Sequence, residues 1–312
     1  MITRFNEVFT TWLDNFGEQY PTATGIMLVI SASAFFASMH ASVRYVSAEM
    51  HPWEVGFFRN LFGFLVFAPV MLRSGIRLLR TDLLMLHVVR GSLNGVSMLC
   101  WFYALAVMPL ADATSVSLTG PLFVTLGAIF FLGEKVRARR WLALGAGVVG
   151  TLIIIRPGVE EVSTGAMLVL ASGVLVAGSK LIAKTLARTD GTMTIVAYLS
   201  LIMTIVTFIP ALFVWRTPTV GELGWLALIG VLGSTGHLLV IRAYKYADVS
   251  AVEPVTFSRL VFAALAGYLV FGEIPDLWVW VGGGVIVAAT SYIAHRETVA
   301  EKSRKGLSNI PS

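Results

Sequence analysis

The sequence contains two related halves, which align without a gap at a constant offset of 139 residues. Ten residues are identical between 104–151 and the stretch that lies 139 residues further on. The clearest matches are Leu132-Gly133-Glu134 with Phe271-Gly272-Glu273, Trp141 with Trp280, and Gly145 with Gly284. Each half holds five long apolar runs. Because five is an odd number of membrane crossings, the second half would enter a bilayer upside down. Inverted repeats around a central site are the ground plan of many secondary transporters.

Composition independently indicates a membrane protein. Hydrophobic residues make up 56% of the chain and charged residues 13%, with a mean hydropathy of +0.80. Soluble domains are about 45–50% apolar and about 25% charged. The net charge of +5 comes from basic residues dispersed through short polar stretches, which argues against a nucleic-acid partner. Cys100 is the only cysteine, which excludes an intrachain disulfide.

Ten apolar runs have about the 17–25 residues that span a bilayer as a helix. They cover 24–46, 54–73, 83–108, 112–133 and 139–156 in the first half, and 164–185, 192–214, 221–245, 249–272 and 277–295 in the second. Each must be helical, because unpaired backbone groups are costly in hydrocarbon. The sequence thus predicts an all-α polytopic membrane protein with ten transmembrane helices as two inverted five-helix repeats, 24–156 and 164–295. A cytoplasmic or interfacial segment, 1–23, and a cytoplasmic tail, 296–312, flank them.

The distribution of lysine and arginine predicts the orientation, because these residues concentrate in cytoplasmic loops. With the N-terminus in the cytoplasm, seventeen of the 23 basic residues fall on the cytoplasmic side. Three fall outside (Arg44, Arg156 and Arg216), and three fall within spans (Arg59, Arg90 and Arg259). Both termini are therefore expected in the cytoplasm of a cell with this protein in its inner, or plasma, membrane.

Several motifs extend over nearly the whole chain. They are Pro52 with Arg59, Tyr103-Ala104-Leu105 leading to Pro109-Leu110-Ala111-Asp112-Ala113, Pro121, and Leu132-Gly133-Glu134 with Gly145 and Gly150 beyond. With these motifs the chain resembles the drug/metabolite transporter superfamily, in its ten-helix EamA branch. The stretch 111–123 is similar to bacterial S-adenosylmethionine and riboflavin uptake carriers. The resemblance implies a central cavity lined by the first, third, fourth, sixth, eighth and ninth helices, with the fifth and tenth at the periphery.

Two motifs have simpler interpretations than their letters suggest. Gly145-Ala-Gly147-Val-Val-Gly150 matches the dinucleotide fingerprint GxGxxG, which needs a strand before it and a helix N-terminus at it. Here it lies inside an apolar run, so we interpret it as close helix packing through small residues. Glu134 and Glu273 could suggest a carboxylate pair, but inverted topology places them on opposite faces of the membrane. We expect them to end helices and contact loops. His51, His87 and His295 lie near the interfaces and are expected to be solvated.

Polar residues inside the spans are the candidates for substrate binding, because buried charge in a bilayer is costly and is retained for function. Arg90, Asn94, Ser97 and Trp101 form one continuous face of the third helix. For that face we favour lining of the cavity over packing against other helices. For Arg59 we favour a structural role over a role in recognising a particular substrate. The full set of candidates is His40, Arg59, Arg90, Asn94, Ser97, Trp101, Tyr103, Thr119, Ser172, Ser234, His237, Glu253 and Arg259.

The position of the acidic residues restricts the mechanism. All six aspartates fall in loops or at helix ends, and among the glutamates only Glu253 and, marginally, Glu54 enter a span. A sodium site made of carboxylates is therefore disfavoured, and proton coupling would need Glu253 or a histidine. Exchange or facilitated diffusion needs neither. We found no HExxH, GxSxG or grouped acids, so an enzyme, a metal site and a cofactor are not expected.

The sequence thus favours a secondary transporter that works by alternating access. An arginine in the cavity indicates a small carboxylated or zwitterionic metabolite such as S-adenosylmethionine. An exporter of amino acids or other metabolites, a riboflavin importer and, more remotely, a non-transporting receptor remain alternatives. The expected partners are the metabolite and the lipid bilayer, and either a monomer or a homodimer fits.

Overall fold

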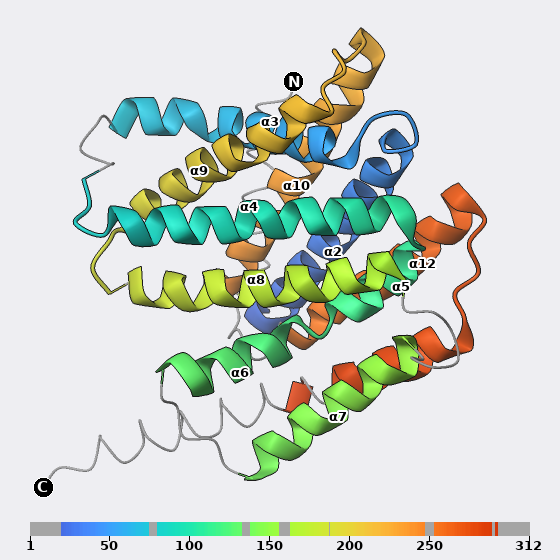
Figure 1. Ribbon diagram of the computed structural model, residues 1–312. Coiled ribbons are helices and arrows are strands. Elements are labelled where there is room, and N and C mark those ends of the chain that lie inside the picture. Colours follow the sequence, from blue (N-terminus) through green and yellow to red (C-terminus); the bar gives the residue numbers. More distant parts are fainter. Residues whose placement is uncertain are drawn as a thin grey trace, which may run out of the picture.

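The computed structural model describes residues 20–74, 80–132, 138–155, 163–186, 188–246, 253–288 and 291–292. Every regular element in these ranges is helical (Figure 1). The first repeat contains α2 (Pro21–Val46), α3 (Pro52–Ser74), α4 (Leu84–Val107), α5 (Leu110–Ser117), α6 (Gly120–Leu132) and α7 (Ala138–Ile155). The second contains α8 (Thr164–Leu186), α9 (Thr192–Phe213), α10 (Val220–Tyr246), the 3-10 helix η2 (Glu253–Phe257), α12 (Ser258–Phe271) and a last helix, Leu277–Ala288. Predicted features in 1–19 and 293–312 lie outside the described residues.

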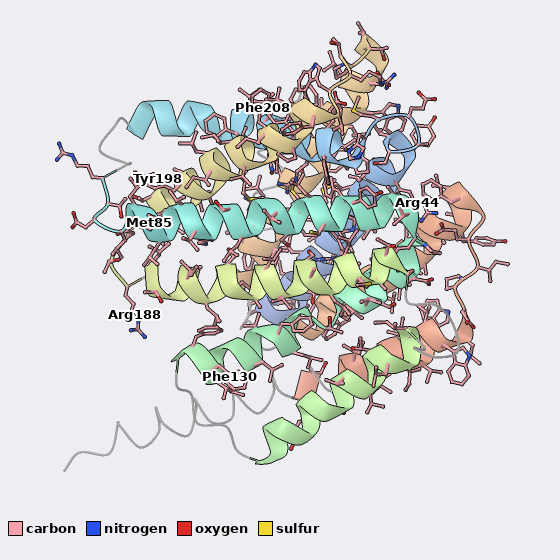
Figure 2. The ribbon with its side chains drawn as sticks, viewed as in Figure 1. Arg44, Met85, Phe130, Arg188, Tyr198 and Phe208 are labelled. Carbon is pink, nitrogen blue, oxygen red and sulfur yellow. The ribbon has the colours of Figure 1, made fainter. Side chains whose placement is uncertain are left out.

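Within the described residues, five helical segments are long and apolar enough to cross a membrane. They are Ala23–Val46, Leu110–Phe131, Thr164–Ala183, Thr194–Phe213 and Val220–Ala243. Large apolar side chains also cover much of the outer surface: Phe130, Phe131 and Phe213 are 73%, 82% and 83% exposed. Figure 2 shows such side chains along the flanks of the helices, with Arg44 and Arg188 at opposite ends. A surface of this kind fits lipid rather than water.

Proline sets the start or end of several helices. Pro21 and Pro52 open α2 and α3, where the missing N–H would have no partner in any case. α4 ends before Pro109, because a proline disfavours helical geometry at the residue that precedes it, here Met108. α12 instead ends at Gly272, whose φ of 69° is accessible to glycine at little cost.

In the fourth span of each repeat the regular α-helix is interrupted, which differs from the continuous helices predicted at 112–133 and 249–272. α5 ends at Ser117 and α6 begins at Gly120, because Pro121 has no N–H to offer the Ser117 carbonyl. In the second repeat the α-helix gives way to the 3-10 helix η2, which passes directly into α12 at Phe257 and Ser258. The two breaks are 139 residues apart, so they occupy equivalent positions in the repeats.

Packing follows the repeat symmetry. α2 packs against α10, and its counterpart α8 packs against α4; the latter two lie side by side in Figure 1. α7 and the last helix cross at Gly150 and Gly282, where an added Cβ on either residue would come within 2.8 Å of the other's backbone oxygen. The structure therefore confirms helix packing as the role of the GxGxxG stretch, because only a residue without a side chain fits there.

Candidate functional site

Four basic side chains from four helices come together inside the bundle. His40 lies on α2, Arg59 on α3, His237 on α10 and Arg259 on α12. Both histidines are within electrostatic range of both arginines. We call these four residues the basic cluster. Each repeat contributes one histidine and one arginine, so the basic cluster lies between the two repeats.

Two aromatic side chains connect the members of the basic cluster. The guanidinium carbon of Arg259 lies 4.7 Å from the centroid of the Phe36 ring, a cation–π geometry. The same ring meets His237 edge-on, with centroids 5.0 Å apart. Trp101 Nε1 donates a hydrogen bond of 3.3 Å to His40 Nε2. Phe36 was not among the sequence candidates, because nothing in an apolar run distinguishes one phenylalanine from another.

His40 carries a buried polar atom without a partner. The indole N–H can only donate, so His40 Nε2 accepts and the ring proton resides on Nδ1. His40 is 5% exposed, and its Nδ1 has no hydrogen-bond partner within the described part of the chain. Leaving a buried donor unsatisfied costs about 1–3 kcal/mol. An acceptor oxygen on a bound molecule would remove this cost.

An exposed side chain and a glycine of α10 border the basic cluster. His237 is exposed although it lies well inside α10. On the same helix, a Cβ added to Gly233 would come within 3.4 Å of both Arg59 Nε and Nη2, and within 2.8 Å of the Met39 sulfur. The absence of a side chain at Gly233 therefore makes room for the Arg59 guanidinium.

The polar face of α4 bonds to the second repeat. Arg90 Nη1 donates to the Ile195 carbonyl of α9 at 3.2 Å, and Asn94 Nδ2 donates to Ser179 Oγ on α8. Ser97 Oγ lies 2.8 Å from the hydroxyl of Ser172 on α8. These contacts fix α4 against α8 and α9. Trp101, on the same face, reaches the basic cluster instead.

The remaining candidates have separate surroundings. Tyr103 lies beside His51 and Trp53, away from the basic cluster, with ring centroids 6.0 and 6.5 Å away. The Thr119 hydroxyl donates to the Val116 carbonyl at the α5–α6 break. Ser234 is buried on α10 next to Gly63. Glu253 begins η2, and its side chain lies outside the described part.

At the end of the bundle that contains Arg44, an ion pair joins the repeats. Arg44 Nη2 of α2 lies 2.5 Å from Glu273 Oε1, which directly follows α12. Arg44 also donates to the Met108 carbonyl, and the Leu110 N–H donates to Glu273 Oε2 at 3.0 Å. Gly267 leaves space for this carboxylate. Glu273 thus contacts the start of α5 through the Leu110 N–H, and its pairing with Arg44 was not predicted.

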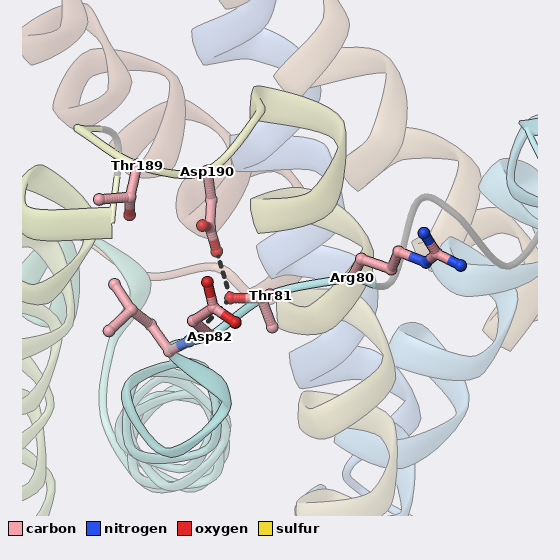
Figure 3. A pocket seen from close by; sticks show the side chains of 6 residues that line it. Arg80, Thr81, Asp82, Thr189 and Asp190 are labelled. Atoms are coloured by element: carbon pink, nitrogen blue, oxygen red, sulfur yellow. Dashed lines mark hydrogen bonds between the residues drawn. The ribbon is translucent and has the colours of Figure 1, made fainter.

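At the opposite end, a second polar cluster joins the repeats. Asp190 Oδ2 accepts a hydrogen bond of 2.6 Å from Thr81 Oγ1 (Figure 3). The same oxygen accepts a second hydrogen bond of 2.6 Å from His87 Nε2. The expectation that His87 is solvated was wrong: it is 1% exposed and stacks on Tyr198 with centroids 4.6 Å apart. A surface pocket of about 360 Å³ lies over Asp190, between the α3–α4 connection and the α8–α9 connection. It is separate from the basic cluster.

We expect this cluster to stabilise the fold in a pH-dependent way. Hydrogen bonds from Thr81 and then His87 hold the pKa of the Asp190 carboxyl below its ordinary value. A lowered acid pKa stabilises the fold above the ordinary pKa of about 4, and the stabilisation is lost as pH falls through the lower folded value. Asp190→Asn should therefore lower the melting temperature at pH 7 by about 2–4 °C. The difference from wild type should shrink below pH 4, and Asp82→Asn serves as a neighbouring control.

An all-helical bundle of apolar, membrane-length helices in two related halves has the architecture of a multi-pass membrane transporter. A family model of EamA-like transporters matches residues 23–156 and, again, residues 163–294. The chain therefore belongs to the EamA-like transporter family, within the drug/metabolite transporter superfamily. It is a transporter and not an enzyme.

Characterised relatives differ in substrate and direction. The chain is 31% identical to a riboflavin transporter of Vibrio cholerae, covering 90% of this chain and 95% of the relative. It is 31% identical to an S-adenosylmethionine uptake transporter of Rickettsia felis, covering 84% and 89%. It is 35% identical to the pseudopaline exporter CntI of Pseudomonas aeruginosa, covering 85% and 94%. A solved crystal structure is similar in fold, with a TM-score of 0.59 and 18% identity over 88% of this chain and 98% of that chain.

Proposed function

We propose that this protein is a secondary transporter that moves a small carboxylated or zwitterionic metabolite, such as S-adenosylmethionine, across the inner membrane by alternating access. The main support for this proposal is the basic cluster, in which one arginine from each repeat lies at the boundary between the two repeats. Guanidinium groups bind carboxylates with charge-assisted hydrogen bonds. The unpartnered Nδ1 of His40 supplies a further donor.

The broken helices support an acidic group on the substrate. α6 begins directly after the two non-helical residues 118 and 119, and Arg259 is the second residue of α12, where the 3-10 helix η2 changes into an α-helix. A helix N-terminus carries a partial positive charge, which favours an anion near it. Discontinuous helices with this arrangement form substrate sites in other transporter folds. A riboflavin importer and an exporter of amino acids or other metabolites are the alternatives.

We propose the full topology as ten spans in two inverted repeats, 24–156 and 164–295, with both termini in the cytoplasm. The Arg188 end of the bundle then faces the cytoplasm, and the Arg44 end faces outward. The excess of basic residues on one side supports this orientation.

An asymmetry between the repeats supports alternating access. Near the Arg44 end, α2 packs against α4 and α5 packs against α12. The counterparts of these pairs, α8 with α10 and η2 with α6, have no comparable packing among the described residues. Among the described residues, packing between the helices is therefore closer at the proposed outer end than at the inner end, as expected of an inward-facing state. Exchange of the two packings would give the outward-facing state.

The substrate class is tested with purified protein. We expect S-adenosylmethionine or another carboxylated metabolite to raise the melting temperature, and reconstituted vesicles to accumulate the same compound. The screen includes riboflavin, amino acids and carnitine-like compounds. Stabilisation by riboflavin alone, without any carboxylated compound, would contradict the proposed class and favour the first alternative.

The orientation predicts which introduced cysteines react from outside. In a Cys100→Ala background, Arg137→Cys and Lys302→Cys should be protected from an impermeant maleimide in intact cells. Thr217→Cys, which lies in the exposed α9–α10 connection, should be labelled readily. All three should react after permeabilisation. Labelling of Arg137→Cys in intact cells would contradict the orientation and the inverted repeat.

A further inference from the structure

Arg59 is attached to the second repeat by a chain of three hydrogen bonds. Thr207 on α9 donates from Oγ1 to the Met203 carbonyl at 2.7 Å. Asn60 Nδ2 donates to Thr207 Oγ1 at 3.2 Å, and Arg59 Nη1 donates to Asn60 Oδ1 at 3.1 Å. Asn60 is 5% exposed and Thr207 is fully buried, so water does not compete for these bonds.

The chain of bonds has one direction only. Because the Thr207 hydroxyl gives its proton to the backbone, its oxygen is left to accept from Asn60. The amide must then turn its N–H towards Thr207 and its oxygen towards Arg59. That oxygen can accept from a guanidinium but cannot neutralise its charge. Arg59 is thus held by a neutral partner and keeps its full charge.

We propose that Asn60 and Thr207 are positioning residues that aim the Arg59 guanidinium at the substrate carboxylate. This inference rests on the proposed function, because it takes Arg59 as one of the groups that bind the carboxylate. A free arginine side chain loses about 2 kcal/mol of rotamer entropy when it is fixed in one geometry. Fixing the side chain before the substrate arrives removes much of that cost from binding. Gly233 leaves the space that the oriented guanidinium occupies.

A conservative series at Thr207 tests the proposal in reconstituted vesicles. The probe is S-adenosylmethionine, replaced by the most stabilising carboxylated compound of the thermal screen if that differs. Thr207→Val keeps the shape and removes the hydroxyl, and we expect KM to rise about tenfold with little change in maximal rate. Thr207→Ser keeps the hydroxyl and should stay within about twofold of wild type. Thr204→Val is the matched control, because that hydroxyl donates only within its own helix, to the Ser200 carbonyl at 2.8 Å.

A second background separates positioning from a structural tie between α3 and α9. In Arg59→Gln protein there is no guanidinium to aim, so adding Thr207→Val should raise KM no further. Melting temperatures of all variants are measured in parallel. If Thr207→Val raised KM equally in wild-type and in Arg59→Gln protein, the positioning role would be overturned and the proposed function would remain intact. An unchanged KM in Arg59→Gln alone would remove Arg59 from the proposed site, and the inference would fail with it.

Discussion

Arg259→Gln should weaken substrate binding more than any other single substitution in the basic cluster. The guanidinium lies at the start of α12, against Phe36, where the repeats meet. Hydrogen bonds to a charged group contribute about 1.5–3 kcal/mol, which corresponds to a rise in KM of roughly 10- to 100-fold. Arg259→Lys should retain part of the affinity, because it keeps the charge but not the planar fork of donors. Transport kinetics in vesicles measure both effects.

The matched control is Arg188→Gln, because Arg188 is exposed in the connection between α8 and α9, far from the basic cluster. It should leave KM within about twofold of wild type, since exposed charges contribute little. Unchanged affinity in Arg259→Gln, with normal expression, would show that this arginine is neutralised within the protein and takes no part in recognition.

The sequence was sufficient for the helical class, because hydrophobic length and backbone chemistry allow few alternatives in a bilayer. It also placed His40, Arg59, His237 and Arg259 among the candidates, since charge and polarity inside an apolar run are visible without a structure. The breaks at 118–119 and 257–258 were not predicted. Pro121 and Pro254 lie near these positions, but the run of apolar residues continues through both of them.

Pairings between distant residues could not be predicted. Asn60 directly follows Arg59, so its polarity was a signal in the sequence, yet nothing there connects it with Thr207, 147 residues away. His87 was expected to be solvated because it lies near the start of the predicted span 83–108, close to the interface. It is buried because Asp190, from the other repeat, covers it. Inverted repeats place such partners far apart in sequence, and only packing brings them together.

The Arg44–Glu273 ion pair should control closure of the proposed outer end. It joins α2 of one repeat to the end of α12 of the other, and both side chains are mostly buried, with exposed fractions of 21% and 15%. If the pair favours the closed outer end by about 2 kcal/mol, its loss would shift the equilibrium about thirtyfold towards the open end. Arg44→Glu and Glu273→Arg should each reduce the maximal transport rate severely. The double exchange should recover much of that rate, because it restores opposite charges.

Cysteine accessibility distinguishes closure from a general loss of folding. Ala37 lies two turns before Arg44 on α2 and is 2% exposed. In a Cys100→Ala background, Ala37→Cys should react slowly with an impermeant maleimide from outside, and much faster when Arg44→Glu is added. Arg216→Glu is the control, because its ion pair with Glu222 lies within the second repeat. Equal labelling rates with and without Arg44→Glu would show that the pair does not close this end. Failure of the exchange to restore transport, with labelling still increased, would show that the bonds to Met108 and Leu110 contribute more to closure than the opposite charges.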